Sequence, residues 1–356
     1  MKTPSTTTVS KGHTLSRRDF LGQSAPAAAA LLAGARAILG TAPAAQPAPA
    51  NRGRPRIGCL SWVFHPLRTG SYPEEAIDLI GELGFEGIEL IVNSREDMRD
   101  YWTDAKVDQL RKQLARHKLV VSQFVMFQPV VEGLTSLDRA EREQSLDYFE
   151  RGCRLGQALG APLINIVAPW ARELGKGQGY IPRYYEVSDQ RPNQKYRINI
   201  SEPFDYAALW QRWVETVKAL LERTRAHGVK LSLEHHTHCM IEDANAFLRL
   251  CDALPDPDLG YNLDLGWTLL QREYPPVAIH KVGRRLVNVH VRDIDRTMRS
   301  FPAFGEGVMD YEGMARALRA VGFNGFLSIE QDRHTAMDMK AVCARYLRTM
   351  KEVLGV

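Results

Sequence analysis

The chain has 356 residues, of which 44% are hydrophobic and 25% are charged, so it is long enough for one large domain or two ordinary ones. Its formal net charge is +4 at pH 7, but residues 1–45 hold five basic residues against one acidic residue and account for all of it. The remainder is formally neutral, which argues against nucleic acid as a partner, because a domain that binds nucleic acid normally carries a basic surplus.

The N-terminal residues differ in composition from the rest of the chain. The stretch "SRRDFLG" at Ser16–Gly22 precedes an Ala/Leu-rich run that ends in small residues at Ala42–Ala45. A twin arginine before a moderately apolar, uncharged run is the pattern of a signal read by the twin-arginine translocase. The alternative is a cytosolic basic amphipathic helix. We expect a signal peptide over 1–45, export to the periplasm or beyond, and no stable membrane span once the signal is removed.

A Pro/Ala/Gly-rich stretch, "QPAPANRGRP" at 46–55, predicts a flexible linker before the folded part. The five cysteines are scattered and contain no CxxC, so we expect buried free thiols rather than a disulfide framework.

From residue 56 onward, short apolar runs alternate with longer stretches of helical period. Strands are expected at 56–60, 87–91, 119–127, 162–168, 229–234, 259–264, 286–291 and 325–330. Helices are expected near 73–83, 104–116, 138–159, 204–227, 241–253, 274–280, 310–321 and 335–353. Eight strands, each followed by a helix, predict parallel pairing and a single closed (β/α)8 TIM barrel over 56–356.

One connection is too long for this pattern. Residues 169–203, after the fourth strand, have neither helical nor strand period and are rich in tyrosine and arginine. Such a loop emerges at the C-terminal face of a barrel, where active sites lie. It is expected to contact a sugar or a polyhydroxylated acid, with a subunit contact in a homo-oligomer as the alternative.

The last four strands share one pattern. In "KLSLE", "YNLD", "VNVHV" and "LSIE" the apolar residues face one way, and a small polar residue and then an acid or a histidine face the other. The residues at the C-terminal ends of these strands are Glu234, Asp264, His290 and Glu330. We therefore expect these four side chains to converge in the barrel.

Three carboxylates placed together without cations would repel one another, and a divalent ion removes that conflict. Three oxygen ligands and one imidazole suit one hard or borderline ion in an open site. Manganese is our first choice, with magnesium, cobalt, iron(II) and zinc as alternatives.

At this point the chain resembles the xylose-isomerase-like TIM-barrel superfamily, which includes sugar phosphate isomerases, ketose 3-epimerases, inosose dehydratases and DNA-repair nucleases. The motifs that carry the resemblance are "ELGFEGIEL", "LSLEHH", "NLDLGW", "VNVHVRDID", "FGEG" and "LSIEQ". They span nearly all of 56–356. They are specific for the fold and the metal centre, and weak for the substrate.

The resemblance to ketose 3-epimerases implies that Glu234, Asp264, His290 and Glu330 are the metal ligands, with Glu234 and Glu330 as the acid–base pair. It also places Arg296 at the substrate. Trp267 stands where the family often has histidine, and Met240 where the epimerases have a further glutamate, so a free ketohexose is a doubtful substrate. The DNA-repair nucleases are disfavoured because their extra histidines are missing.

Further residues are expected at the mouth of the barrel. His236 shares the face of Glu234, Trp62 follows the first strand, and both are candidates, with Trp267, for contact with the substrate. His235 and His238 are expected to be structural. Glu89 ends the second strand and is expected to point inward, with no partner assigned.

These observations predict an exported, metal-dependent carbohydrate isomerase or epimerase that works by proton transfer through a metal-stabilised enediolate. One alternative is a keto-sugar lyase or dehydratase, acting on a 3-keto-glycoside or an inosose at the same site. Another is a non-catalytic sugar-binding barrel.

Overall fold

The computed structural model describes residues 53–169, 202–237, 239–298, 300–332 and 337–356. The expected signal peptide at 1–45, the linker up to residue 52, His238 and nearly all of the loop at 169–203 lie outside these ranges. The statements below concern the described residues.

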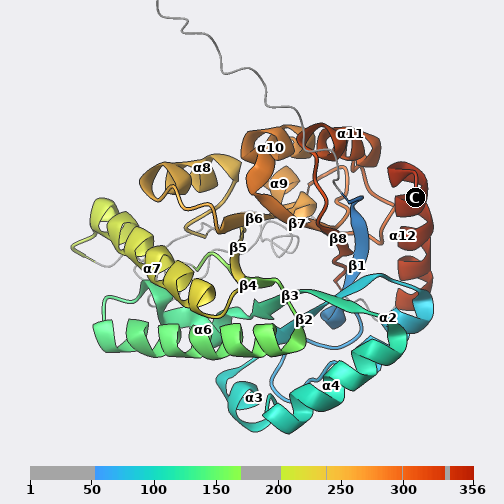
Figure 1. Cartoon of the computed structure of the whole chain (residues 1–356). Coiled ribbons are helices and arrows are strands. Elements are labelled where there is room, and N and C mark those ends of the chain that lie inside the picture. Colours follow the sequence, from blue (N-terminus) through green and yellow to red (C-terminus); the bar gives the residue numbers. More distant parts are fainter. Residues whose placement is uncertain (1–52, 170–201, 238, 299, 333–336) are drawn as a thin grey trace, which may run out of the picture. The chain divides into compact units, whose positions relative to one another are not determined.

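Eight parallel strands close into a barrel in chain order (Figure 1). They are β1 (Arg56–Leu60), β2 (Gly87–Val92), β3 (Val120–Met126), β4 (Leu163–Val167), β5 (Lys230–Glu234), β6 (Leu259–Asp264), β7 (Leu286–Val291) and β8 (Phe326–Ile329). The ring closes where β1 pairs with β8, in the register Arg56 to Phe326. The predicted single (β/α)8 barrel is confirmed.

Helices surround the barrel on its outside (Figure 1). The longer ones are α2 (Glu74–Leu83), α4 (Asp104–His117), α6 (Arg139–Leu159), α7 (Tyr206–Ala226), α8 (Ala244–Ala253), α10 (Pro275–Val282), α11 (Tyr311–Val321) and α12 (Met339–Leu354). Three short helices were not expected: α3 (Arg95–Asp100), α5 (Gln128–Val131) and α9 (Leu265–Leu270). Because helices cover the parallel sheet, its strands are buried on both faces, as in β2, where every residue is buried.

Aspartate caps explain where several helices begin. The side chain of Asp243 accepts a hydrogen bond from the backbone N–H of Ala246, at 2.8 Å, so α8 starts at Ala244 and not at the expected residue 241. Asp338 caps α12 in the same way through Ala341, at 3.1 Å, and moves its start to Met339. The capping hydrogen bond therefore decides the first residue of each helix, and the spacing of apolar residues alone predicts a start that is too early.

The N-terminal end of the barrel is filled by one aromatic ring against glycine. A Cβ at Gly87 on β2 would overlap the ring of Phe326 on β8, and a Cβ at Gly58 on β1 would lie 2.6 Å from Ser328 Oγ. The guanidinium of Arg56 covers the same ring, 4.0 Å from its centroid. Glycine at positions 58 and 87 therefore makes room for Phe326 on the last strand.

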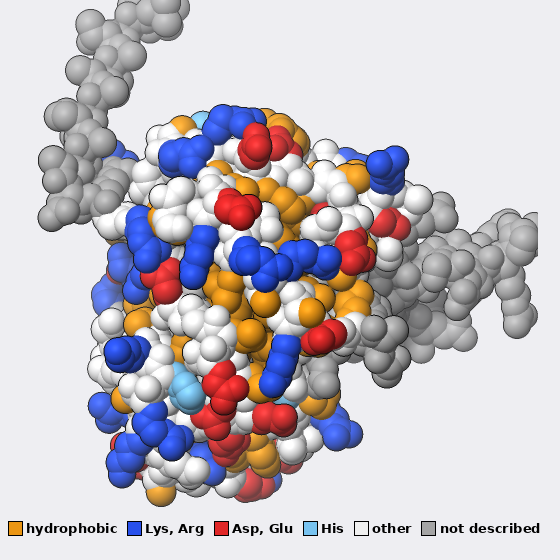
Figure 2. All heavy atoms as spheres, turned by 90° about the vertical axis from the view of Figure 1, so that its right-hand side faces the viewer, with side chains coloured by type: hydrophobic (Ala, Val, Ile, Leu, Met, Phe, Trp, Pro, Cys, Tyr) orange, Lys and Arg blue, Asp and Glu red, His pale blue; other side chains and the backbone are white. Residues whose placement is uncertain are grey.

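The cysteines and the surface agree with the composition. All five cysteines are free and buried, as predicted. No helix in the described ranges is long and apolar enough to cross a membrane. Basic and acidic side chains both occur across the face in Figure 2, in keeping with a folded region of formally balanced charge.

Candidate metal centre

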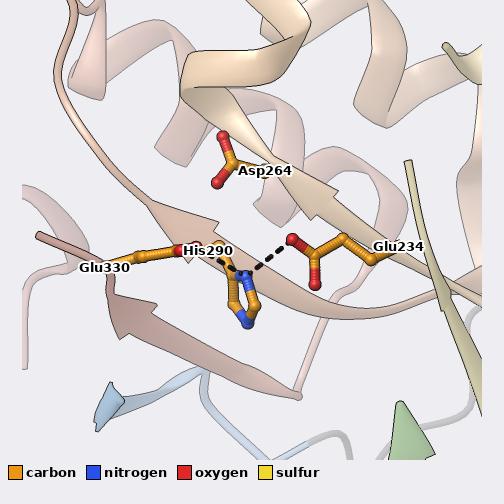
Figure 3. Close-up of side chains that lie close together, drawn as sticks. All are labelled: Glu234, Asp264, His290 and Glu330. Atoms are coloured by element: carbon orange, nitrogen blue, oxygen red, sulfur yellow. Dashed lines mark ion pairs between the residues drawn. The ribbon is translucent and has the colours of Figure 1, made fainter. Parts of the chain in front are cut away.

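The four predicted ligands come together at the C-terminal ends of β5 to β8 (Figure 3). Glu234, Asp264 and His290 end or lie within β5, β6 and β7, and Glu330 follows β8 directly. One ligand atom from each lies within 4.8 Å of all the others. The Nδ1 atom of His290 is 3.3 Å from Glu234 Oε1 and 3.0 Å from Glu330 Oε2. The sequence therefore identified a real cluster.

The side chains fit a divalent cation. Glu234, Asp264 and His290 are 4%, 0% and 1% exposed, and the buried oxygen Oε2 of Glu330 faces Nδ1 of His290. Burial raises the pKa of Asp264 to about 8, although Arg292 opposes the rise. Burial would lower the pKa of His290, but Glu89 and Glu234 raise it well above its ordinary value. A cluster that draws protons onto its own side chains is short of positive charge, and three carboxylates with one imidazole suit a hard or borderline divalent ion.

Arg292 is a buried residue of the site that the sequence pattern did not predict. Its Nε donates to Asp264 Oδ2 at 3.0 Å, its guanidinium pairs closely with Glu330 Oε1, and it lies 3.4 Å from Asp332. It is 4% exposed. Burial would lower the pKa of Arg292, but Glu330 and Asp264 raise it well above its ordinary value, so it is a permanent cation.

The sequence did contain a signal for Arg292. It stands two residues after His290 and four after Asn288, in the phase that points into the barrel. The alternation predicts the direction of side chains only within a strand, and Arg292 lies just beyond the end of β7.

Glu89 lies in the middle of β2 and not at its end as expected, but it does point inward, and its partner is His290. Its carboxylate lies 2.9 Å from the Nε2 atom of His290, on the side of the ring away from Glu234 and Glu330. Both side chains are almost fully buried. The ring of His290 therefore lies between a carboxylate from β2 and the candidate ligand oxygens.

The residues predicted to contact substrate divide into two groups. His236 packs against Trp267 with ring centroids 3.7 Å apart, and Trp62 lies edge-on to His290 at 6.4 Å. Of these three side chains, Trp62 lies beside a candidate ligand, and the other two pack on each other. Arg296 is exposed in the turn after β7 and forms no ion pair with another described residue, so its predicted role stays a prediction.

His235 has the surroundings of a structural residue. It is fully buried, its Nε2 lies 3.1 Å from the hydroxyl of Thr268, and its ring stacks on Tyr261 at 5.2 Å. Burial lowers its pKa to about 4, which keeps it neutral near pH 7.

The glycine turn at 305–307 is built around a carboxylate of the chain itself. Asp293 Oδ2 accepts hydrogen bonds from the backbone N–H groups of Gly305 and Gly307, at 3.0 and 2.9 Å. Its Oδ1 accepts from Ile294 and Met309. A Cβ at Gly307 would overlap this carboxylate, so the glycine is required for the close approach.

Comparison with known proteins agrees with the geometry. The family model described as a xylose isomerase-like TIM barrel matches residues 77–352. L-ribulose-5-phosphate 3-epimerase UlaE from Escherichia coli O17:K52:H18 (strain UMN026) is 25% identical over 278 residues, which are 76% of this chain and 86% of that protein.

Solved structures show the same fold. D-psicose 3-epimerase in the presence of D-fructose is 18% identical, with a TM-score of 0.64, over 85% of this chain and all of that one. The 3-keto-D-glucoside 4-epimerase YcjR from E. coli is 17% identical, with a TM-score of 0.62, over 83% of this chain and all of that one.

Proposed function

The chain belongs to the xylose isomerase-like TIM barrel family, and we propose that it is a divalent-metal-dependent sugar epimerase or isomerase. The observation that carries the proposal is the converging set of Glu234, Asp264, His290 and Glu330. The epimerase names of its relatives support the reaction class.

A metal ion bound by these four residues would polarise the carbonyl of a keto-sugar and make the neighbouring C–H group more acidic. The chain itself supplies the proton transfer. Figure 3 shows Glu234 and Glu330 on opposite sides of His290, which suits removal of a proton on one face and its return on the other.

The two glutamates differ in what holds them. Burial would raise the pKa of Glu330, but Arg292 and His290 outweigh it and hold that pKa well below its ordinary range. Glu330 is therefore ionised, with Arg292 and His290 as its counter-charges. Glu234 instead accepts a hydrogen bond from the amide of Asn262 at 2.9 Å.

The surrounding side chains would position the sugar. The paired rings of His236 and Trp267, and Trp62 beside His290, are flat surfaces of the kind that suits the C–H face of a sugar ring. Arg296 remains a proposed substrate contact.

Export is part of the proposal and rests on the twin arginine at Arg17 and Arg18. An exported enzyme would meet free or oxidised sugars more often than phosphosugars. Its substrate is therefore best sought first among keto-sugars and keto-glycosides.

The test combines metal analysis with solvent exchange. The purified protein should contain about one divalent ion per chain, and incubation with ketoses, ketose phosphates and 3-keto-glycosides in deuterated water should place deuterium at the carbon next to the carbonyl. Glu234→Gln and Glu330→Gln should abolish this exchange. Glu312→Gln, the same change at an exposed residue of α11, should leave it intact.

The outcomes separate the alternatives. Exchange with an epimerised or isomerised product supports the proposal, and release of an aglycone or water assigns a lyase instead. Binding of sugar without exchange assigns a non-catalytic barrel. A protein that binds no divalent ion would rule out the mechanism.

A further inference from the structure

Glu89 collects three donors inside the barrel. It is 0% exposed at the centre of β2. Its Oε2 lies 2.9 Å from His290 Nε2 and accepts from Gln123 at 2.7 Å, and its Oε1 accepts from Asn288 at 2.9 Å. β2 and β7 are not neighbours, since β8 and β1 stand between them in the ring, so the contact crosses the interior of the barrel. A buried carboxylate with this many donors is held in one orientation.

The Glu89 contact decides which nitrogen of His290 faces the ligands. With a divalent ion held by Glu234 and Glu330, the imidazole would offer its lone pair on the side of these two residues. Because a carboxylate only accepts hydrogen bonds, the remaining hydrogen would lie on Nε2, next to Glu89. The amide nitrogens of Gln123 and Asn262 also lie 3.2 Å from Nε2, but the charged acceptor is closer and bonds more strongly. The lone pair is then on Nδ1, the atom that faces Glu234 and Glu330.

The same polar layer reaches a second ligand. Asn288 Nδ2 donates to Asn262 Oδ1 at 3.0 Å, and Asn262 Nδ2 donates to Glu234 Oε2 at 2.9 Å. Ser232 Oγ donates to the other end of the Gln123 amide at 3.0 Å. Asn288, Asn262 and Ser232 each stand two positions before a candidate ligand. With Gln123 they form a layer of hydrogen-bonded side chains, which connects Glu89 with Glu234 and His290.

We propose that Glu89 is the positioning residue of the metal centre: it holds His290 with Nδ1 towards the ion and raises the affinity of the site for a divalent metal. The inference rests on the metal site of the proposed function. A carboxylate is needed because three donors converge on it, whereas glutamine at this position has a single acceptor oxygen and would turn its own N–H groups towards one of them. Changing such an outer partner of a ligating histidine typically weakens metal binding by about 10- to 100-fold.

The test measures metal affinity and not turnover. The metal-free protein is titrated with Mn²⁺ by calorimetry, and Glu89→Gln should bind about 10- to 100-fold more weakly than wild type. Ser328→Ala is the matched control, because Ser328 is fully buried inside the same barrel and its hydroxyl has no hydrogen-bond partner. Its affinity should stay within about twofold, since it holds no ligand.

A second readout reports the nitrogen directly. In zinc-loaded protein labelled with 15N-histidine, the signal of His290 should show a hydrogen on Nε2 and none on Nδ1. If Glu89→Gln fails to fold, Gln123→Met replaces it: this variant keeps the charge, removes one donor that holds Glu89, and should weaken Mn²⁺ binding more than Ser328→Ala does.

The results distinguish the inference from the function beneath it. Wild-type affinity in Glu89→Gln, or in the replacement variant, overturns the inference alone, as does a hydrogen on Nδ1 of His290. A wild-type protein that binds no Mn²⁺ and no Zn²⁺ overturns the proposed metal site and, with it, the role of Glu89.

Discussion

The two halves of the barrel contribute differently to the candidate site. Strands β5 to β8 supply or immediately precede all four ligands, and Arg292 follows β7. Strands β1 to β4 supply no candidate ligand among the described residues, but Glu89 on β2 and Gln123 on β3 reach the back of His290. The candidate ligands are therefore concentrated on four adjacent strands, while side chains from the other half contact one of them across the interior.

The largest expected effect comes from the charge of the β5–β8 half. Arg292→Met would leave the carboxylate of Glu330 without its permanent counter-charge and the carboxyl group of Asp264 without its guanidinium donor. Removing one partner of such a buried pair costs about 3–5 kcal/mol, so the free energy of unfolding in EDTA should fall by that amount. Chemical denaturation measures it, and saturating Mn²⁺ should recover part of the loss.

Arg316→Met serves as the control for this variant, because Arg316 is an exposed residue of α11. It should change the free energy of unfolding by no more than about 0.5 kcal/mol. If Arg292→Met were as stable as wild type in EDTA, the two carboxylates would not need the guanidinium, and the assignment of Arg292 would be wrong.

A smaller loss of stability is expected from a change in packing at the N-terminal end of β2, in the β1–β4 half. Gly87→Ala would push a methyl group into the ring of Phe326. Overpacking of this kind costs about 1–3 kcal/mol, and because Gly87 lies at the far end of its strand from the ligands, Mn²⁺ affinity should be unchanged. Thermal unfolding and calorimetry would measure the two quantities.

Gly53→Ala is the matched substitution, since a Cβ there would meet nothing within 4 Å, and we expect no change in its melting temperature. Weakened Mn²⁺ binding in Gly87→Ala would contradict this separation of the two ends of the barrel. It would mean that packing at the N-terminal ends of the strands affects the ligands at the C-terminal ends.

The smallest expected effect lies outside the barrel, between α2 and α4. Gln113 holds the pKa of Asp78 below its ordinary value of 3.8, against the opposing effect of partial burial, and His117 at 2.8 Å adds to the lowering. A carboxyl whose pKa is lower in the folded chain stabilises the fold above pH 3.8, and that stabilisation is lost as the pH falls through the folded pKa.

Asp78→Asn should therefore cost about 1 kcal/mol or less near pH 7, because the side chain is 45% exposed and solvent screens its pairs. The difference from wild type should shrink below pH 3.8 in urea unfolding series in EDTA. If the difference in the free energy of unfolding between Asp78→Asn and wild type stayed constant down to pH 2, the shape of the side chain and not its charge would account for the loss of stability. Asp108→Asn, an exposed change on α4, provides the baseline.

The ligands could be predicted because the information is local. An alternation of period two and the end of a strand are both visible in a few residues, and the same pattern in four strands identified Glu234, Asp264, His290 and Glu330. Arg292 was missed although it continues that alternation, because its position falls in the turn after β7.

Other features depend on which strands face one another. Glu89 and His290 are 201 residues apart, and their contact follows from the curvature of the closed ring and not from any motif. Helix starts were displaced for a different reason: at Asp243 and Asp338, a single capping hydrogen bond decides the first residue of the helix. The spacing of apolar residues therefore predicts neither which side chains meet across the closed barrel nor the residue at which a capped helix begins.

The pairing of β1 with β8 also bears on how the protein is made. The backbone N–H of Arg56 bonds to the carbonyl of Gly325 at 2.9 Å, so the first strand keeps an open edge until nearly the whole chain has left the ribosome. Contacts of such long sequence separation form late and slowly. During synthesis, Glu89 would emerge long before His290, and the complete pocket could first exist only after Ile329 and Glu330 are free to dock. Until then β1 is an unpaired edge, at which a nascent chain of this fold is open to wrong pairings.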